Sequence, residues 1–169
     1  IHDGFNLEAN PFEGSQKSLL AKTIFHSSET TIFSLVVDMQ EWDGDWIVNT
    51  EKGHVHYPSH ITVTSSLGED EGSRERISFK IDVSGKSSNL IDTGSLTLYI
   101  QDTEQQQFTV REQQTFFNGM GAAPTPTMRT SNFEFNQSLE GMTLQAYKTL
   151  TKHQMVYGLD YEKTETTRP

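Results

Sequence analysis

Cysteine is absent from the 169-residue sequence. Its absence excludes disulfides, thiolate nucleophiles, iron–sulfur sites and cysteine-based zinc sites. The compartment stays open, because chains of this size without cysteine occur on both sides of a membrane. The chain begins with Ile1 rather than with methionine. This is what a precursor with a removed leader, or a trimmed chain, would show.

Basic residues are scarce. Thirteen Lys and Arg stand against 23 Asp and Glu, which gives a net charge of −10. Binding to DNA draws most of its affinity from Lys and Arg that displace counterions, and anionic membrane surfaces attract basic segments in the same way. We therefore expect no nucleic-acid partner and no attraction to an anionic membrane surface.

Long apolar runs are missing as well. A membrane-spanning helix needs roughly 18 apolar residues, whereas the longest apolar pieces here lie around Ile32–Val37 and Ile47–Val48. We expect a soluble chain with no membrane span. Ten Phe, five Tyr and two Trp can supply the core of one domain.

Catalytic motifs are also lacking. The sequence contains no GxSxG, no Walker A motif, no GxGxxG before a helix and no HExxH. This disfavours hydrolases and nucleotide enzymes of the kinds that carry such motifs, and leaves open enzymes without local motifs.

What the sequence does contain is alternation of apolar and polar residues. Over Arg76–Val83, apolar residues occupy every second position. This period of two is typical of a half-buried β-strand. The other segments with this pattern are Ile61–Ser65, Ser95–Gln101, Gln107–Thr115, Ser131–Asn136, Met142–Leu150 and Gln154–Lys163.

Turn residues separate several of these segments. Gly68–Gly72 and Ser84–Lys86 each follow a predicted strand. The segment Asn118–Arg129 holds Pro124 and Pro126, which cannot donate to a sheet ladder, so we predict a loop or an edge there.

One segment, Ser27–Gln40, fits two structures. Ser27 or Ser28 could cap a helix whose apolar face includes Ile32, Leu35, Val36 and Met39. The many β-branched residues in the same segment favour a strand. Both alternatives stay open.

The strand count predicts a mainly β fold. About eight short strands with at most one or two short helices are typical of a single antiparallel β-barrel or of a β-sandwich. We expect an irregular N-terminal arm over residues 1–18, one barrel domain over residues 19–163 and a C-terminal tail over residues 164–169.

The segment Trp42–Trp46 places two indole rings around Gly44. These tryptophans can close the core or form an aromatic wall at the mouth of a barrel. Asp43 and Asp45 are too few for an EF-hand calcium loop, which needs acids at further fixed positions.

Three histidines lie close together in the sequence. His54 and His56 share a face if they lie in a strand, but Pro58 interrupts the segment before His60, and no carboxylate completes a ligand set. We predict neither a metal nor a cofactor. Ligand hydrogen bonding, acid–base chemistry and a solvated surface all suit a near-neutral imidazole.

Arg111 is the other charged candidate. With Tyr99 upstream, it can face an interior and pair with a carboxylate, or it can face solvent. Its neighbour Glu112 has the opposite parity, so the two cannot both face inward.

Two resemblances extend this interpretation. Glu41–Trp46, then Gly53, then Arg76–Phe79 resemble the entry of lipocalin-like (calycin) barrels, in particular an uncharacterised plastid and cyanobacterial family related to phycobiliprotein lyases. This resemblance implies an up-and-down barrel that holds a small apolar ligand or a pigment.

The second resemblance is to the START/Bet v 1-like helix-grip fold. Thr23–His26, then Ser28–Asp38, then Trp42 and Trp46 are similar to its first strand and first helices. It implies an α+β fold that also encloses a cavity.

We therefore expect a barrel that binds a small apolar or pigment-like molecule, as a carrier or chaperone. The alternatives are a cyclase, isomerase or lyase that uses the same cavity, and a structural or adhesive β-sandwich module. The oligomeric state is open, with a homodimer as one option. The expected ligand contacts are Trp42, Trp46, Tyr99, Phe108 and Tyr147, and the catalytic candidates are His54, His56 and Arg111.

Overall fold

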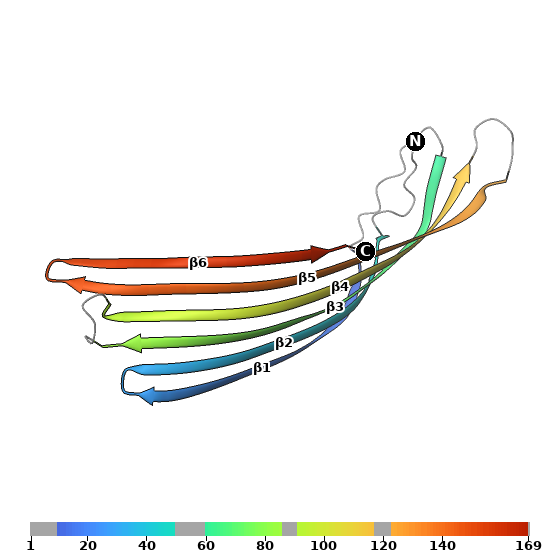
Figure 1. Ribbon diagram of the computed structural model, residues 1–169. Coiled ribbons are helices and arrows are strands. Elements are labelled where there is room, and N and C mark those ends of the chain that lie inside the picture. Colours follow the sequence, from blue (N-terminus) through green and yellow to red (C-terminus); the bar gives the residue numbers. More distant parts are fainter. Residues whose placement is uncertain (1–9, 50–59, 86–90, 117–122, 169) are drawn as a thin grey trace. The chain divides into compact units, whose positions relative to one another are not determined.

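The computed structural model describes residues 10–49, 60–85, 91–116 and 123–168. These residues form one antiparallel sheet in which each strand lies beside its neighbour in the sequence (Figure 1). The six strands are β1 (Phe12–Ser28), β2 (Thr31–Ile47), β3 (His60–Ser84), β4 (Thr93–Phe116), β5 (Thr125–Leu150) and β6 (His153–Thr167).

Contacts divide the chain into two compact units. The first consists of Ile1–Gln16, Trp42–Gly72 and Gln105–Glu134, and the second of Lys17–Glu41, Ser73–Glu104 and Phe135–Pro169. Strands β1 to β5 contribute to both units, whereas β6 belongs to the second alone.

The prediction of a mainly β chain is confirmed, but the prediction of a closed barrel is wrong. The sheet has six strands rather than eight, and it stays open, with β1 and β6 at its two ends. Within the described ranges there is no α-helix and no second sheet, so the helix-grip and sandwich alternatives are wrong as well. The strand count was too high because neighbouring predicted strands are parts of the same long strand.

The predicted turn at Gly68–Gly72 shows why. These residues continue β3 without interruption. A Cβ atom at position 68 would overlap the indole ring of Trp46, so this glycine permits close packing of a side chain from β2. A glycine inside a strand often marks a site of close approach.

The segment Ser27–Gln40 forms a hairpin, so its strand alternative is confirmed and its helix alternative is wrong. β1 ends at Ser28 and β2 begins at Thr31. The Ser28 hydroxyl accepts a hydrogen bond from the backbone N–H of Thr30 at 3.2 Å. The Ser28 side chain therefore accepts from a backbone N–H in a tight turn, and not at the start of a helix.

The turn after β3 begins where the sequence predicts it. β3 ends at Ser84, and Gly85 has φ of +134°, a conformation that side-chain-bearing residues rarely adopt. Its N–H donates to the carbonyl of Asp92 at 2.9 Å. The third residue of this predicted turn, Lys86, lies outside the described residues.

The loop predicted at Asn118–Arg129 is shorter than expected, because β5 already starts at Thr125. Residues 117–122 lie outside the described ranges. Pro126 is compatible with the strand because the pairing of β5 with β6 starts only at Asn136. The first part of β5 therefore has no β6 neighbour, and prolines are tolerated on such edges. At the two ends, residues 12–18 lie in β1 and residues 164–167 in β6.

In the second unit, the alternation separates two faces. The pairs Met142↔Tyr161 and Leu144↔Leu159 of β5 and β6 share one face, and the polar pair Thr143↔Asp160 lies on the other. The apolar face continues across β1 to β3 through stacked rings, with centroid distances of 6.4 Å from Phe25 to Phe33 and 6.0 Å from Phe33 to Phe79. We name these the apolar face and the polar face.

The apolar face is in contact with water. Phe25 is 63 % exposed, Ile100 54 % and Leu159 55 %. Among the described residues the buried apolar side chains are Val48, Val63 and Ala146. A single sheet layer cannot bury its apolar side by itself. This face is therefore the surface on which further apolar contacts can form.

Candidate functional site

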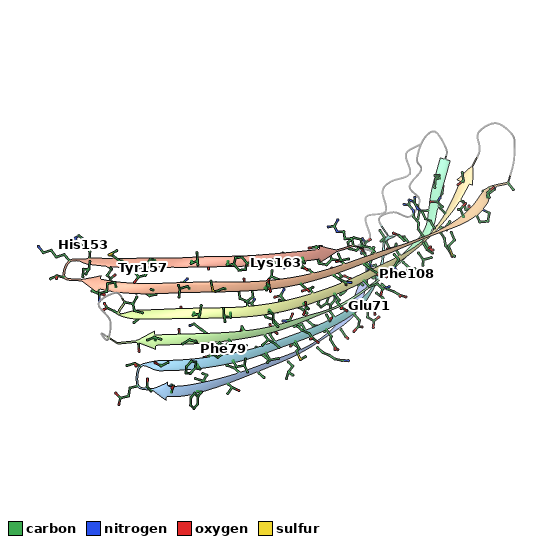
Figure 2. All side chains as sticks on the ribbon, viewed as in Figure 1. Glu71, Phe79, Phe108, His153, Tyr157 and Lys163 are labelled. Carbon is green, nitrogen blue, oxygen red and sulfur yellow. The ribbon has the colours of Figure 1, made fainter. Side chains whose placement is uncertain are left out.

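The candidate site is a hollow of about 460 Å³ on the apolar face of the second unit. Four consecutive strands contribute to it, so the alternation that gives the sheet its apolar side also lines the site. Figure 2 labels one of its residues, Phe79, on β3. The side chains that form this apolar hollow are Ile77, Phe79, Leu98, Ile100, Met142 and Tyr161.

A polar region adjoins the hollow. A second hollow, of about 220 Å³, shares Ile100 and Glu140 with the first. We call this second hollow the polar end. Its charged and hydroxyl-bearing residues are Asp102, Ser138, Glu140, Lys163 and Glu165.

Ion pairs hold the side chains of the polar end. Lys163 Nζ lies 2.7 Å from Glu165 Oε1 and 3.8 Å from Glu140 Oε1. The hydrogen bond with Glu165 raises the pKa of Lys163 and lowers the pKa of Glu165, so both stay charged near neutral pH. The Ser138 hydroxyl donates to Asp102. Three carboxylates against one ammonium give the polar end an excess of negative charge.

Behind the hollow, a row of side chains crosses the polar face. The guanidinium carbon of Arg76 lies 4.5 Å from the ring centroid of Tyr99, a cation–π contact. The Tyr99 hydroxyl donates to Glu162 Oε2 at 3.0 Å, and this hydrogen bond is the main cause that raises the pKa of Tyr99. The row joins β3, β4 and β6 directly behind the apolar hollow.

The predicted ligand contacts do not gather in one place. Trp42, Trp46 and Phe108 belong to the first unit, and Tyr99 and Tyr147 to the second. Phe108 lines an acidic hollow of about 260 Å³ in the first unit (Figure 2 labels it together with Glu71). The acids of this hollow are Asp43, Asp45, Glu69, Asp70 and Glu71.

Polar partners occupy part of that acidic hollow. The Gln105 amide donates to Asp70 at 3.0 Å, and the Ser15 hydroxyl donates to Asp43 at 2.6 Å. Over the described part of the chain, no group of three His, Asp or Glu side chains has the arrangement of a metal site.

In the second unit, Tyr147 lies on β5 opposite Val156 and is 45 % exposed. Its neighbours hold the turn between β3 and β4. The Tyr147 carbonyl accepts from Asp92 N–H at 2.8 Å, and the Asp92 carboxylate accepts from Lys148 Nζ at 2.8 Å and from Thr149 N–H at 2.7 Å.

Of the three catalytic candidates, Arg111 lies within the described residues. His54 and His56 lie outside the described residues. Arg111 lies in the part of β4 that belongs to the first unit and is half-buried. Its neighbour Glu112 accepts a hydrogen bond from the Ser65 hydroxyl at 3.0 Å. Cyclase, isomerase or lyase chemistry by these residues stays a prediction.

Of the residues around the apolar hollow, Tyr99 is one of the predicted ligand contacts. The other lining residues are not among them, although the sequence signal for them is present. Ile77 and Phe79 supply the clearest alternation of the chain, and Leu98 and Ile100 the next. The alternation predicts one apolar side for each of these strands but assigns no ligand-binding role to it. The open sheet leaves these apolar side chains exposed.

The chain matches no model of a known protein family and no curated protein sequence. The described residues also contain no helix long and apolar enough to cross a membrane.

Proposed function

We propose that the chain binds an elongated apolar molecule along the hollow of its second unit, as a carrier or chaperone for that molecule. The observation that carries this proposal is an apolar hollow of about 460 Å³ that leads into a charged end. Small-molecule sites have volumes of roughly 300–1,000 Å³ and combine an apolar lining with few polar groups. The hollow meets both criteria.

The affinity follows from the area that a ligand would cover. Removing roughly 300 Å² of apolar surface from water, counted on both partners, contributes about 7 kcal/mol. The loss of translational and rotational freedom cancels several kcal/mol of this gain. Because the hollow covers only one side of a ligand and about 3 kcal/mol of net binding free energy remains, we expect a Kd in the millimolar range.

The polar end selects the head group of the ligand. Asp102, Glu140 and Glu165 face a ligand there with a single ammonium, that of Lys163. This excess of negative charge repels a carboxylate and attracts a cation. We therefore propose a ligand with an apolar chain and a cationic or uncharged polar end.

The test uses three amphiphiles with the same alkyl chain and different head groups. Octylamine, 1-octanol and octanoate are each titrated at low millimolar concentrations, within the solubility of the alcohol and below the critical micelle concentrations of the two ionic probes. Methyl resonances of Ile77, Leu98, Ile100 and Met142 report binding by NMR. We expect the amine to bind most tightly and the carboxylate most weakly. Unchanged methyl resonances with all three probes would reject the proposal.

Two matched variants locate the binding site. Ile100→Gln places an amide in the hollow, and Leu20→Gln makes the same kind of change at a residue of β1 that does not line it and is 70 % exposed. We expect Ile100→Gln to weaken binding of the amine several-fold and Leu20→Gln to leave it unchanged. Equal losses in both variants would show non-specific adsorption and contradict the proposed site.

A further inference from the structure

The two edges of the sheet in the second unit carry opposite charge. On β1, the stretch Lys17–Ser28 contains Lys17 and Lys22 and no acidic residue. On β6, three carboxylates outnumber the single ammonium of Lys163. Among the residues that the structure describes, each edge strand has a sheet neighbour on one side only, β2 for β1 and β5 for β6. Within these residues, the outer side of each strand is therefore available for pairing.

Both edges lack two of the usual protections against strand addition. Natural edge strands are commonly short, interrupted by proline, distorted by bulges or lined with charged side chains. β1 has 17 residues and β6 has 15, and neither sequence contains proline. What the edges do carry is charge of one predominant sign. Like charges disfavour pairing of β1 with β1 and of β6 with β6, whereas opposite charges favour pairing of β1 with β6.

The positions of the charges select one register. Lys17 and Lys22 are five residues apart, and so are Asp160 and Glu165. In an antiparallel pair, one register places Lys17 opposite Glu165 and Lys22 opposite Asp160 together. Because five is an odd number, the two ion pairs lie on opposite faces of the sheet.

The same register also matches the faces of the two strands. It places Phe25 of β1 opposite Tyr157 of β6. Phe25 belongs to the apolar face through its stack with Phe33, and Tyr157 through its pairing with Ala146, two residues from Leu144 on β5. Aromatic cross-strand pairs stabilise a sheet. The apolar face of one copy would thus continue directly into that of the next.

We propose that copies of this chain associate edge to edge, with β1 of one copy paired antiparallel to β6 of the next in the register Lys17–Glu165 and Lys22–Asp160. The contact joins two different surfaces, so it cannot close as a two-fold dimer. It builds a ring if the rotation between copies closes and an open chain of copies if it does not. This assembly goes beyond ligand binding, because it uses the edges of the sheet, and it meets the ligand site where Tyr161, Lys163 and Glu165 lie on β6.

Cross-linking between introduced cysteines tests the register. The chain has no cysteine of its own, so every disulfide in a mixture of Lys22→Cys and Asp160→Cys chains joins two introduced cysteines. Mass spectrometry of the linked peptides separates the mixed pair from dimers of one variant with itself. Directly opposed residues have Cα atoms about 4.5–5.5 Å apart, within the reach of a disulfide. The control mixes Lys22→Cys with Thr164→Cys, a position four residues and roughly 13 Å further along β6.

We expect a disulfide-linked dimer from the first mixture and none from the control. Sedimentation velocity on the unmodified chain should show species larger than the 19.1 kDa monomer. Lys22→Glu should reduce these species, and Lys22→Glu combined with Asp160→Lys should restore them. A chain that stays monomeric, or equal cross-linking in both mixtures, would overturn the proposal.

Discussion

The Tyr99 hydroxyl reaches Glu162 across an entire strand, at a distance of 3.0 Å. The strand between them is β5, and the residue of β5 that stands opposite Glu162 is Gly141. A Cβ atom at position 141 would overlap the phenol ring of Tyr99. The missing side chain of Gly141 therefore provides the space in which Tyr99 passes over β5, and three strands are joined by one hydrogen bond.

Gly141→Ala should break this arrangement. The new methyl group forces the ring of Tyr99 away from β5, and overpacking of this kind costs roughly 1–3 kcal/mol of unfolding free energy. Urea denaturation measures the loss. The matched control is Gly94→Ala on β4, where the nearest atom to the new Cβ is 3.4 Å away. We expect the control to retain its stability, and equal losses in both variants would contradict the role given to Gly141.

The hydrogen bond to Glu162 also predicts a pH dependence. It is the main cause that raises the pKa of Tyr99 above its ordinary value. Its stabilising effect is therefore complete below the ordinary pKa of tyrosine and is lost as the pH rises through the raised value. Glu162→Gln should bring the pKa of Tyr99 down towards that ordinary value. Alkaline titration of the phenolate absorbance measures the shift.

A variant without the hydroxyl assigns this titration. Tyr99→Phe should remove the part of the absorbance curve that shifts in Glu162→Gln. If Glu162→Gln leaves the titration curve of the protein unaltered, then the hydrogen bond does not govern Tyr99 in solution.

Asp92 should be important for stability because it fastens the turn before β4 to the end of β5. Its carboxylate accepts from Lys148 Nζ and from the N–H of Thr149, and the two ion-pair side chains are 21 % and 18 % exposed. Asp92→Ala should lower the unfolding free energy by about 1–3 kcal/mol, since it leaves a partly buried ammonium and an amide without their acceptor.

The control for Asp92 is another ion pair of the second unit. Lys80 and Asp82 lie 2.8 Å apart, but both are more exposed. Asp82→Ala should change the unfolding free energy by less than about 0.5 kcal/mol, as is usual for surface pairs. Thermal or urea denaturation compares the two variants. If Asp82→Ala lowers the unfolding free energy as much as Asp92→Ala does, the structural role given to Asp92 is contradicted.

Phe33 should contribute more to stability than its partial exposure suggests. It stacks between Phe25 and Phe79, so Phe33→Ala removes two ring contacts at once. We expect a loss of about 1–2 kcal/mol, below the values for fully buried phenylalanine. Leu20→Ala, at a position that is 70 % exposed, should cost little. Urea denaturation measures both variants. Equal decreases of the denaturation midpoint in Phe33→Ala and Leu20→Ala would contradict the importance of the ring stack.

Local pattern was a good guide to which residues form strands. The alternation over Arg76–Val83 predicts a segment of β3, and the β-branched residues after Thr30 correctly favour the strand. Strand length was less accessible. The local pattern around Gly68 indicates a turn. The packing of Gly68 against Trp46 is a contact between strands, which a local pattern does not reveal.

Whether the sheet closes into a barrel cannot be predicted from the local pattern of each strand. Whether β1 meets β6 depends on the position of two strands at opposite ends of the chain, and each strand alone looks the same in a barrel and in an open sheet. This error carried over to the site. Tryptophan, histidine and arginine were chosen for their chemistry, whereas the apolar hollow consists of ordinary residues such as Ile77 and Leu98 that the open sheet leaves exposed.

The sequential order of the strands has a consequence for how the chain folds. Every strand pairs with its neighbour in the sequence, so no strand has to wait for a distant segment before it gains a partner. Closing the short connections at Glu29–Thr30 and Thr151–Lys152 forms two hairpins at opposite ends of the chain. Contacts beside these two turns have low sequence separation and can form early, whereas contacts such as Tyr99–Glu162, 63 residues apart, form later. We therefore expect the sheet to grow strand by strand from these two turns.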